Sequence, residues 1–199
     1  MNFIPKLVKR KLQVKNAFAD YLIRGKAKKI FSVRFVQNKL KAENLQTPFF
    51  VVLTRGNLHV IKLFMRYIPN DQECVIVLNG LERWEREWAI KNLNPTGFIV
   101  FPFLIDHWMV IDYLLSWFEE PFGLIDEDCF VFDENCFSEI KFIPNQSLIS
   151  SYYSLRNSEL HLGFPETMFM FLNTPVLNRI RESYGLSSAP LTWEQLPHK

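Results

Sequence analysis

Two aspartates separated by one residue, Asp126 and Asp128, are the clearest candidates for chemistry in the sequence. They follow a short apolar run, Phe122 to Ile125, which is typical of a buried strand. Two carboxylates this close repel each other unless a cation lies between them. Hard oxygen ligands of this kind suit Mg²⁺ or Mn²⁺, which keep coordination positions open for substrate phosphates. We therefore predict that Asp126 and Asp128 are metal ligands.

Apolar runs alternate with helical patterns before and up to this acidic group. The predicted strands are 49–53, 74–78, 98–101 and 122–125, and the predicted helices are 58–68, 81–93 and 106–118. This alternation predicts an α/β fold, with a mostly parallel sheet, helices on both faces and right-handed crossovers. After Asp128 the pattern is less regular and indicates only a strand at 168–172 and a helix at 175–184.

Polar residues follow the other predicted strands as well. Thr54 and Arg55 come after the first strand, and Asn79 ends the second. In an open parallel sheet, ligands bind beyond the carboxyl ends of the strands. These side chains are therefore expected to line the same cleft as the acidic group.

The acidic element resembles that of a known family. FGLIDEDCFVF is similar to the apolar strand and Asp-x-Asp motif of GT-A glycosyltransferases, including bacterial enzymes that build surface polysaccharides. FFVVLTRGN resembles that fold's first strand and turn, CVIVLNG its second strand, and IDHWMVIDYLL the helix before the motif. The resemblance covers roughly residues 47 to 185 and implies the GT-A (Rossmann-like) form of the predicted fold. It also implies a metal-dependent transfer of sugar from a nucleotide diphosphate donor, with UDP-sugars favoured, to a glycan or lipid-linked acceptor hydroxyl.

The resemblance assigns further residues to the nucleotide side of the site, namely Thr54, Arg55, Asn79, His107, Asp112 and Glu127. Glu127, between the two aspartates, is expected to point the other way or to border the sugar. Glu166, in FPETMFMFLNTPVL, is the candidate catalytic base. Two departures stand out: Asn79 replaces the Asp that ends the second strand in many relatives, and Trp108 lies where a small residue is expected.

Three other readings of the acidic group compete with this one. A glycosyltransferase-like scaffold at the membrane surface, without turnover, would share the fold but ignore the loss of the aspartates. A haloacid-dehalogenase-type phosphatase also uses Asp-x-Asp after an apolar strand, but its motif continues with Thr or Val where this chain has Phe130. A calcium loop needs oxygen ligands and a glycine at positions that this chain fills with apolar residues.

Charge divides the 199-residue chain into a basic arm, 1–46, and a domain, 47–199. Residues 1–45 carry twelve Lys and Arg against two acids, whereas the rest carries eleven basic and nineteen acidic residues. The arm has helical apolar spacing, which suits either an anionic membrane surface or packing on the domain. The acidic body disfavours nucleic acid.

Location is predicted from what the sequence lacks. It has no signal-peptide pattern, no apolar run long enough to span a bilayer and no paired cysteine motif among its three cysteines. These features predict a cytoplasmic protein, with the inner face of the membrane as a possible place of attachment.

Overall fold

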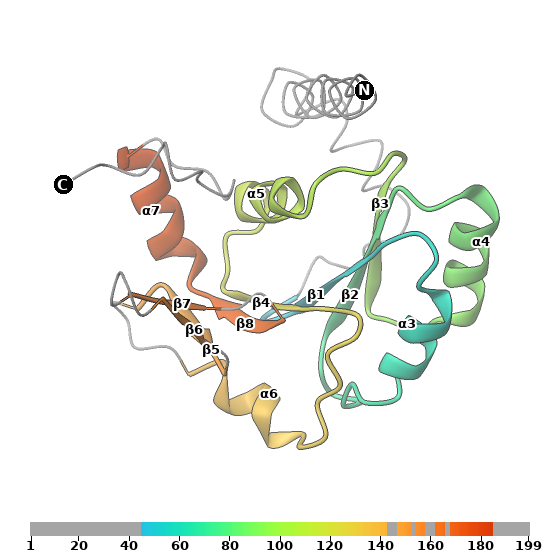
Figure 1. The fold of residues 1–199 in the computed structure, drawn as a ribbon, viewed down its shortest axis with the longest axis horizontal. Helices are drawn as coiled ribbons and strands as arrows, with labels where there is room; N and C mark the ends of the chain where they lie inside the picture. The colour runs from blue at the N-terminus through green and yellow to red at the C-terminus, as the bar shows by residue number, and fades with distance from the viewer. Residues whose placement is uncertain (1–44, 143–146, 153, 158–161, 166–167, 185–199) are drawn as a thin grey trace, which may run out of the picture.

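A mostly parallel β-sheet forms the centre of the molecule (Figure 1). The computed structural model describes residues 45–142, 147–152, 154–157, 162–165 and 168–184, so residues 1–44 of the basic arm and Glu166 lie outside the described residues. Within this part of the chain, the main sheet has the order β3-β2-β1-β4-β8-β5. Its strands are β1 (Phe49–Leu53), β2 (Cys74–Asn79), β3 (Gly97–Phe101), β4 (Phe122–Ile125), β5 (Ile149–Ser151) and β8 (Phe169–Leu172).

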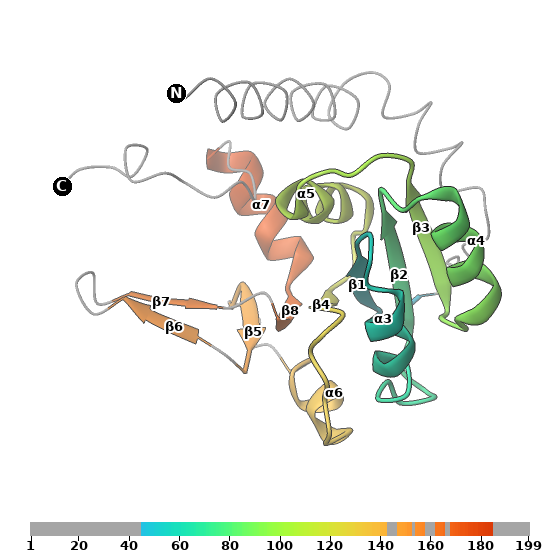
Figure 2. The same cartoon turned by 45° about the vertical axis from the view of Figure 1, so that its right-hand side comes forward.

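Helices cover both faces of this sheet (Figures 1 and 2). On one face, α5 (His107–Trp117) and α7 (Thr174–Tyr184) pack on strand residues such as Phe50, Val52 and Val77. On the other, α3 (Leu58–Phe64), α4 (Arg83–Asn92) and α6 (Asn135–Glu139) pack on residues such as Val51 and Ile76. Alternate residues of one strand enter opposite cores because strand side chains alternate in direction. This explains why β1 and β2 are apolar at every position up to Asn79.

The predicted α/β fold with helices on both faces is confirmed. β1 to β4 are mutually parallel, and the four predicted strands and three predicted helices are all present with small shifts at their ends. The later strand β8 pairs with β4 in the antiparallel direction. The region after Asp128 also holds elements that were not predicted: α6, β5 and a separate hairpin of β6 (Ser154–Asn157) and β7 (Leu162–Pro165). These pieces have three to five residues, too few to show a clear period.

Phenylalanines fill the core beneath β4. The ring of Phe49 lies 5.2 Å from that of Phe137 and 5.6 Å from that of Phe169, measured between centroids. Phe49 pairs directly with Gly123 of β4, where a Cβ atom would come within 2.1 Å of the Phe49 ring. The glycine is therefore required for β1 and β4 to lie side by side, and this pairing brings the ends of the two strands together.

None of the helices in the described part of the chain is both long and apolar enough to cross a membrane.

Candidate functional site

The carboxyl ends of β1, β2, β3 and β4 meet at one edge of the sheet, since these strands are parallel. The turn after β1 (residues 54–57), the end of β2 (Asn79, Gly80) and the acidic loop after β4 (residues 126–128) all lie at this edge. β8 begins here too, and the Asp126 amide donates a hydrogen bond to the Met168 carbonyl, with a distance of 2.9 Å. The edge thus collects most of the residues that the sequence predicted for the site.

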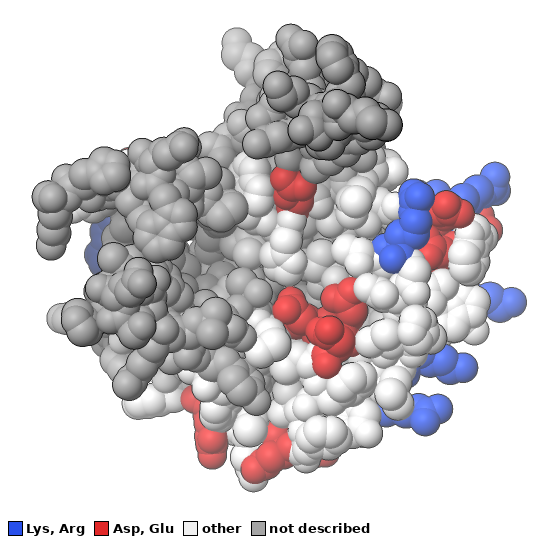
Figure 3. Space-filling view, in the orientation of Figure 1, with Lys and Arg blue, Asp and Glu red and all other residues white. Residues whose placement is uncertain are grey.

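Acidic side chains gather near the middle of one face of the molecule, over the loop that follows β4 (Figure 3). Asp126 and Glu127 are half-buried and Asp128 is exposed. Within the described residues, no side chain or backbone group hydrogen-bonds or ion-pairs with the carboxylate of Asp126 or of Asp128. These two groups therefore keep their oxygens available for a ligand.

The surroundings of Asp126 work against its negative charge. Burial raises the pKa of its carboxyl group, and the neighbouring charges of Glu127 and Asp128 raise it further, while His107 lowers it in part. His107 is the first residue of α5, so the start of this helix brings the imidazole close enough to act on Asp126. A cation between the carboxylates would relieve this repulsion.

Glu127, between the two aspartates, is bound by the turn after β1. Its Oε1 accepts a hydrogen bond of 2.7 Å from Asn57 Nδ2 and a longer one of 3.4 Å from the Thr54 hydroxyl. Asn57 Nδ2 also lies 3.2 Å from Thr54 Oγ1. Glu127 therefore joins the acidic loop to the turn after β1. Sequence analysis missed Asn57, although it closes the polar turn TRGN that was assigned to this edge.

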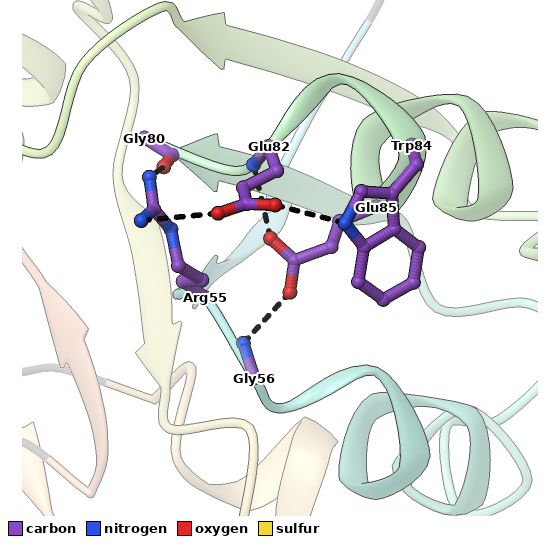
Figure 4. A network of polar contacts seen from close by, with 6 residues as sticks. All are labelled: Arg55, Gly56, Gly80, Glu82, Trp84 and Glu85. Carbon is purple, nitrogen blue, oxygen red and sulfur yellow. Dashed lines mark hydrogen bonds and ion pairs between the residues drawn. The ribbon is translucent and has the colours of Figure 1, made fainter.

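Arg55 belongs to a second polar network, which links the turn after β1 to the start of α4 (Figure 4). Its guanidinium forms an ion pair of 3.3 Å with Glu82 and donates to the Gly80 carbonyl at 3.4 Å. The buried carboxylate of Glu85 accepts from the amides of Gly56 and Glu82, at 2.8 and 2.9 Å. Arg55 is thus engaged by its own protein at the rim of the site.

Glu82 also holds an exposed tryptophan in place. Its second oxygen accepts a hydrogen bond of 2.9 Å from the indole N–H of Trp84, and Figure 4 shows this bond on the side of Glu82 away from Arg55. Both acids at the start of α4 are therefore occupied by donors within the protein.

Asn79 has a structural explanation for its departure from the family pattern. Its side chain is buried, donates to the Ile105 carbonyl at 2.9 Å and accepts from the Ile105 amide at 3.0 Å. An amide can make both bonds, whereas an ionised Asp can only accept. The next residue, Gly80, has φ of 67°, and a Cβ there would come within 2.2 Å of the Leu104 backbone. The end of β2 is therefore locked to the loop before α5.

The structure places Asp112 between two helices. Asp112 is buried on α5 and forms an ion pair of 2.6 Å with Arg181 of α7. It lies five residues beyond His107, which corresponds to about 7.5 Å along the helix axis. Asp112 thus forms an ion pair with α7, and His107 lies beside the acidic loop. Trp108 of α5, the second departure from the family pattern, packs against the core between α5 and the sheet.

The donors at this edge suit a hard cation only if a ligand adds oxygens. Among the described residues, no group of three or more His, Cys, Asp or Glu side chains could hold a metal ion by itself. Burial, together with Asp126 and Asp128, raises the pKa of the neighbouring Cys129 thiol to about 11, so Cys129 does not offer a thiolate ligand at neutral pH. Two carboxylates and open positions fit Mg²⁺ or Mn²⁺ shared with phosphate oxygens.

This sheet order, with helices on both faces, defines an α/β domain with a Rossmann-like sheet. Residues 26–177 match the family model described as the StrH glycosyltransferase N-terminal domain. The match covers more than half of the chain, which therefore belongs to this family.

A curated relative is similar over part of its length. The dTDP-dihydrostreptose–streptidine-6-phosphate dihydrostreptosyltransferase of Streptomyces griseus is 30% identical over 92 residues, a match that covers 45% of this chain and 23% of the relative. The chain thus matches about a quarter of that enzyme.

Solved structures show more distant likeness. The WbbM bifunctional glycosyltransferase has a TM-score of 0.47 and 10% identity, covering 72% of this chain and 34% of that one. A cytidylyltransferase from Leptospira borgpetersenii serovar Hardjo-bovis has a TM-score of 0.46 and 15% identity, covering 76% and 68%. Likeness at this level adds nothing to the family assignment.

Proposed function

We propose that this chain binds the donor of a glycosyltransferase reaction, in which a sugar moves from a nucleoside diphosphate to an acceptor hydroxyl. One observation carries the proposal: at the carboxyl edge of the sheet, Asp126 and Asp128 have no hydrogen-bond or ion-pair partner among the described residues, whereas Glu127 between them is engaged. Family membership supports the same class of reaction.

Asp126 and Asp128 are the residues that would hold a divalent cation. Such an ion supplies charge neutralisation to the diphosphate and so favours its departure from the sugar. The half-buried Asp126 and the exposed Asp128 would bind the ion from the loop after β4, while His107 lies beside Asp126 at the start of α5. Thr54, Arg55 and Asn79 support this edge of the sheet through contacts within the protein. Glu166 stays the candidate base from the family resemblance.

The chemical classes of the donor and of the acceptor are also part of the proposal. The name of the Streptomyces griseus relative specifies a dTDP-linked donor, and the family resemblance favours a UDP-linked one. Both are pyrimidine nucleoside diphosphates, so we propose a donor of this class. A glycan or lipid-linked acceptor, and contact of residues 1–45 with an anionic membrane on the cytoplasmic side, extend the proposal.

A thermal-shift experiment tests the donor site directly. The full chain is melted with UDP, dTDP, CDP or GDP, with and without Mn²⁺, beside Asp128→Asn and the control Glu134→Gln, an exposed acid of the loop before α6. A ligand at about 100 times its Kd adds about 2.7 kcal/mol. For a chain of this size that is a rise of about 5–10 °C in melting temperature.

The expected result is a shift with a pyrimidine nucleotide that requires Mn²⁺, disappears in Asp128→Asn and survives in Glu134→Gln. No shift with any nucleotide would contradict the proposal and favour a scaffold that keeps only the shape of the domain. A shift that survives Asp128→Asn would leave nucleotide binding but remove the metal site.

A further inference from the structure

Asn57 stands at the start of α3, but its side chain does not serve that helix. Asn at this position normally accepts a hydrogen bond from a backbone N–H of the first turn. Here Asn57 makes no such bond and turns instead toward Glu127, 70 residues away in sequence. A side chain that leaves its usual local partner for a distant one indicates a role in the distant loop.

The chemistry of the pair fixes which atoms meet. An ionised carboxylate can only accept hydrogen bonds, so the donor toward Glu127 must be the NH₂ group of Asn57. At 2.7 Å this is a short, charge-assisted bond, which is stronger than one between neutral groups. Thr54 adds a weaker bond to the same Oε1 atom. The acidic loop is thus tied to the turn after β1 through a single carboxylate oxygen.

We propose that Asn57 is a positioning residue of the donor site: by holding Glu127 against the turn after β1, it sets the loop that presents Asp126 and Asp128 to a cation. The inference rests on the proposed function and adds a residue that touches neither the metal nor the nucleotide. Glu127 is then a tether rather than a ligand. Replacing a residue that orients metal ligands without touching the metal typically lowers metal affinity by about 10–100-fold.

A double-mutant cycle tests whether Asn57 acts through Glu127. Isothermal titration measures the Kd of Mn²⁺ with UDP or dTDP, whichever binds the native chain, for Asn57→Ala, Glu127→Ala and the double variant. We expect each single change to weaken binding about tenfold or more, and the double variant to be no weaker than Glu127→Ala alone. Equal losses from Asn57→Ala in both backgrounds would overturn the proposal, since Asn57 would then act independently of Glu127.

Exchanging the amide and the carboxylate between positions 57 and 127 tests whether the hydrogen bond itself positions the loop or whether the single variants simply lose structure. In Asn57→Asp the two facing carboxylates repel, so binding should weaken at least as much as in Asn57→Ala. Adding Glu127→Gln keeps every heavy-atom position and reverses donor and acceptor. We expect the Asn57→Asp/Glu127→Gln chain to regain affinity to within about threefold of native.

The reversal also has a result that rejects the inference. If the reversed pair stays as weak as Asn57→Asp alone, Glu127 contributes its own charge to the ion and is not a tether. Melting without ligand monitors folding of each variant. A native chain that binds no Mn²⁺-nucleotide at all would be a different failure, that of the proposed function, and would remove this inference with it.

Discussion

Two groups of acidic side chains lie at the same edge of the sheet and have opposite surroundings. At the start of α4, Glu82 and Glu85 are fully occupied by donors from the protein: backbone amides, the Arg55 guanidinium and the Trp84 indole (Figure 4). After β4, Asp126 and Asp128 have no such donors among the described residues, and only Glu127 between them is engaged.

The contrast separates acids that build the edge from acids that are left for a ligand. A carboxylate that accepts backbone N–H bonds stabilises a turn, and replacing it leaves those donors without a partner. A carboxylate beside other carboxylates, with no donor, destabilises the apo chain and becomes favourable only with a cation. Satisfied and unsatisfied acids at one edge therefore predict different responses to the same kind of substitution.

The largest difference is expected in metal-dependent nucleotide binding. Asp126→Asn and Asp128→Asn each remove one carboxylate that has no partner among the described residues. We expect each to weaken Mn²⁺-dependent nucleotide binding more than about a hundredfold, which exceeds the effect of residues that only orient metal ligands. Glu82→Gln, the matched change in the other group, should alter the Kd less than about threefold. Isothermal titration checks all three, and a comparable loss in Glu82→Gln would erase the distinction between the groups.

The sequence predicts those features of this edge that depend on local patterns, but not those that depend on contacts between distant residues. The strands β1, β2 and β4 and the position of Asp126 and Asp128 follow from apolar runs and their polar ends, which are local patterns. The engagement of these acids is not local, since Asn57 and Glu127 meet from 70 residues apart. No spacing along the chain indicates that Glu127 accepts hydrogen bonds from the protein while Asp126 and Asp128 do not among the described residues.

Asp112 and Asn79 are two further residues whose partners could not be predicted from local sequence. The sequence placed Asp112 with the nucleotide, but its partner Arg181 is 69 residues away on a helix that packs on α5 only in the folded chain. Asn79 was also assigned to the nucleotide side, and the structure adds that it is buried and pairs with the Ile105 backbone. Residue type and position on a helix or strand located both side chains, whereas their partners come from tertiary packing.

The second prediction concerns stability and the occupied group. Glu85→Ala removes the acceptor for the amides of Gly56 and Glu82, so the free energy of unfolding should fall by about 2 kcal/mol. For this chain that corresponds to a drop of about 4–8 °C in melting temperature. The control is Glu87→Ala on the same helix, an exposed residue paired with Arg83, which should cost less than about 0.5 kcal/mol. Equal effects of the two changes would show that the buried carboxylate adds nothing to the turn.

The third prediction is a gain in stability, opposite to the loss expected for Glu85→Ala, when a carboxylate of the acidic loop is replaced. The pKa of Asp126 is raised above the ordinary value of an aspartate in the folded chain, mainly by burial. The folded state therefore holds its proton to higher pH than the unfolded state does, and stability falls as the pH rises through this range. Asp126→Asn should thus raise the melting temperature of the metal-free chain at neutral pH, and the gain should vanish below about pH 4.

Melting curves in EDTA at several pH values measure this gain. A lower melting temperature for Asp126→Asn at neutral pH would show that the Asp126 carboxylate is satisfied by the protein, as Glu85 is, and would contradict its assignment to the unoccupied group.

The smallest effect is expected at Trp84, at the outer end of the occupied group. Trp84→Phe removes the indole N–H that binds Glu82, but Glu82 keeps Arg55, and the Trp84 side chain is 60% exposed. The free energy of unfolding should therefore change by less than about 0.5 kcal/mol, with the nucleotide Kd unchanged. Trp88→Phe, which alters a partly buried ring packed on the core, should cost more stability. A tenfold loss of nucleotide affinity in Trp84→Phe alone would place the Glu82 group in contact with the ligand, because neither stability nor packing would then account for the change.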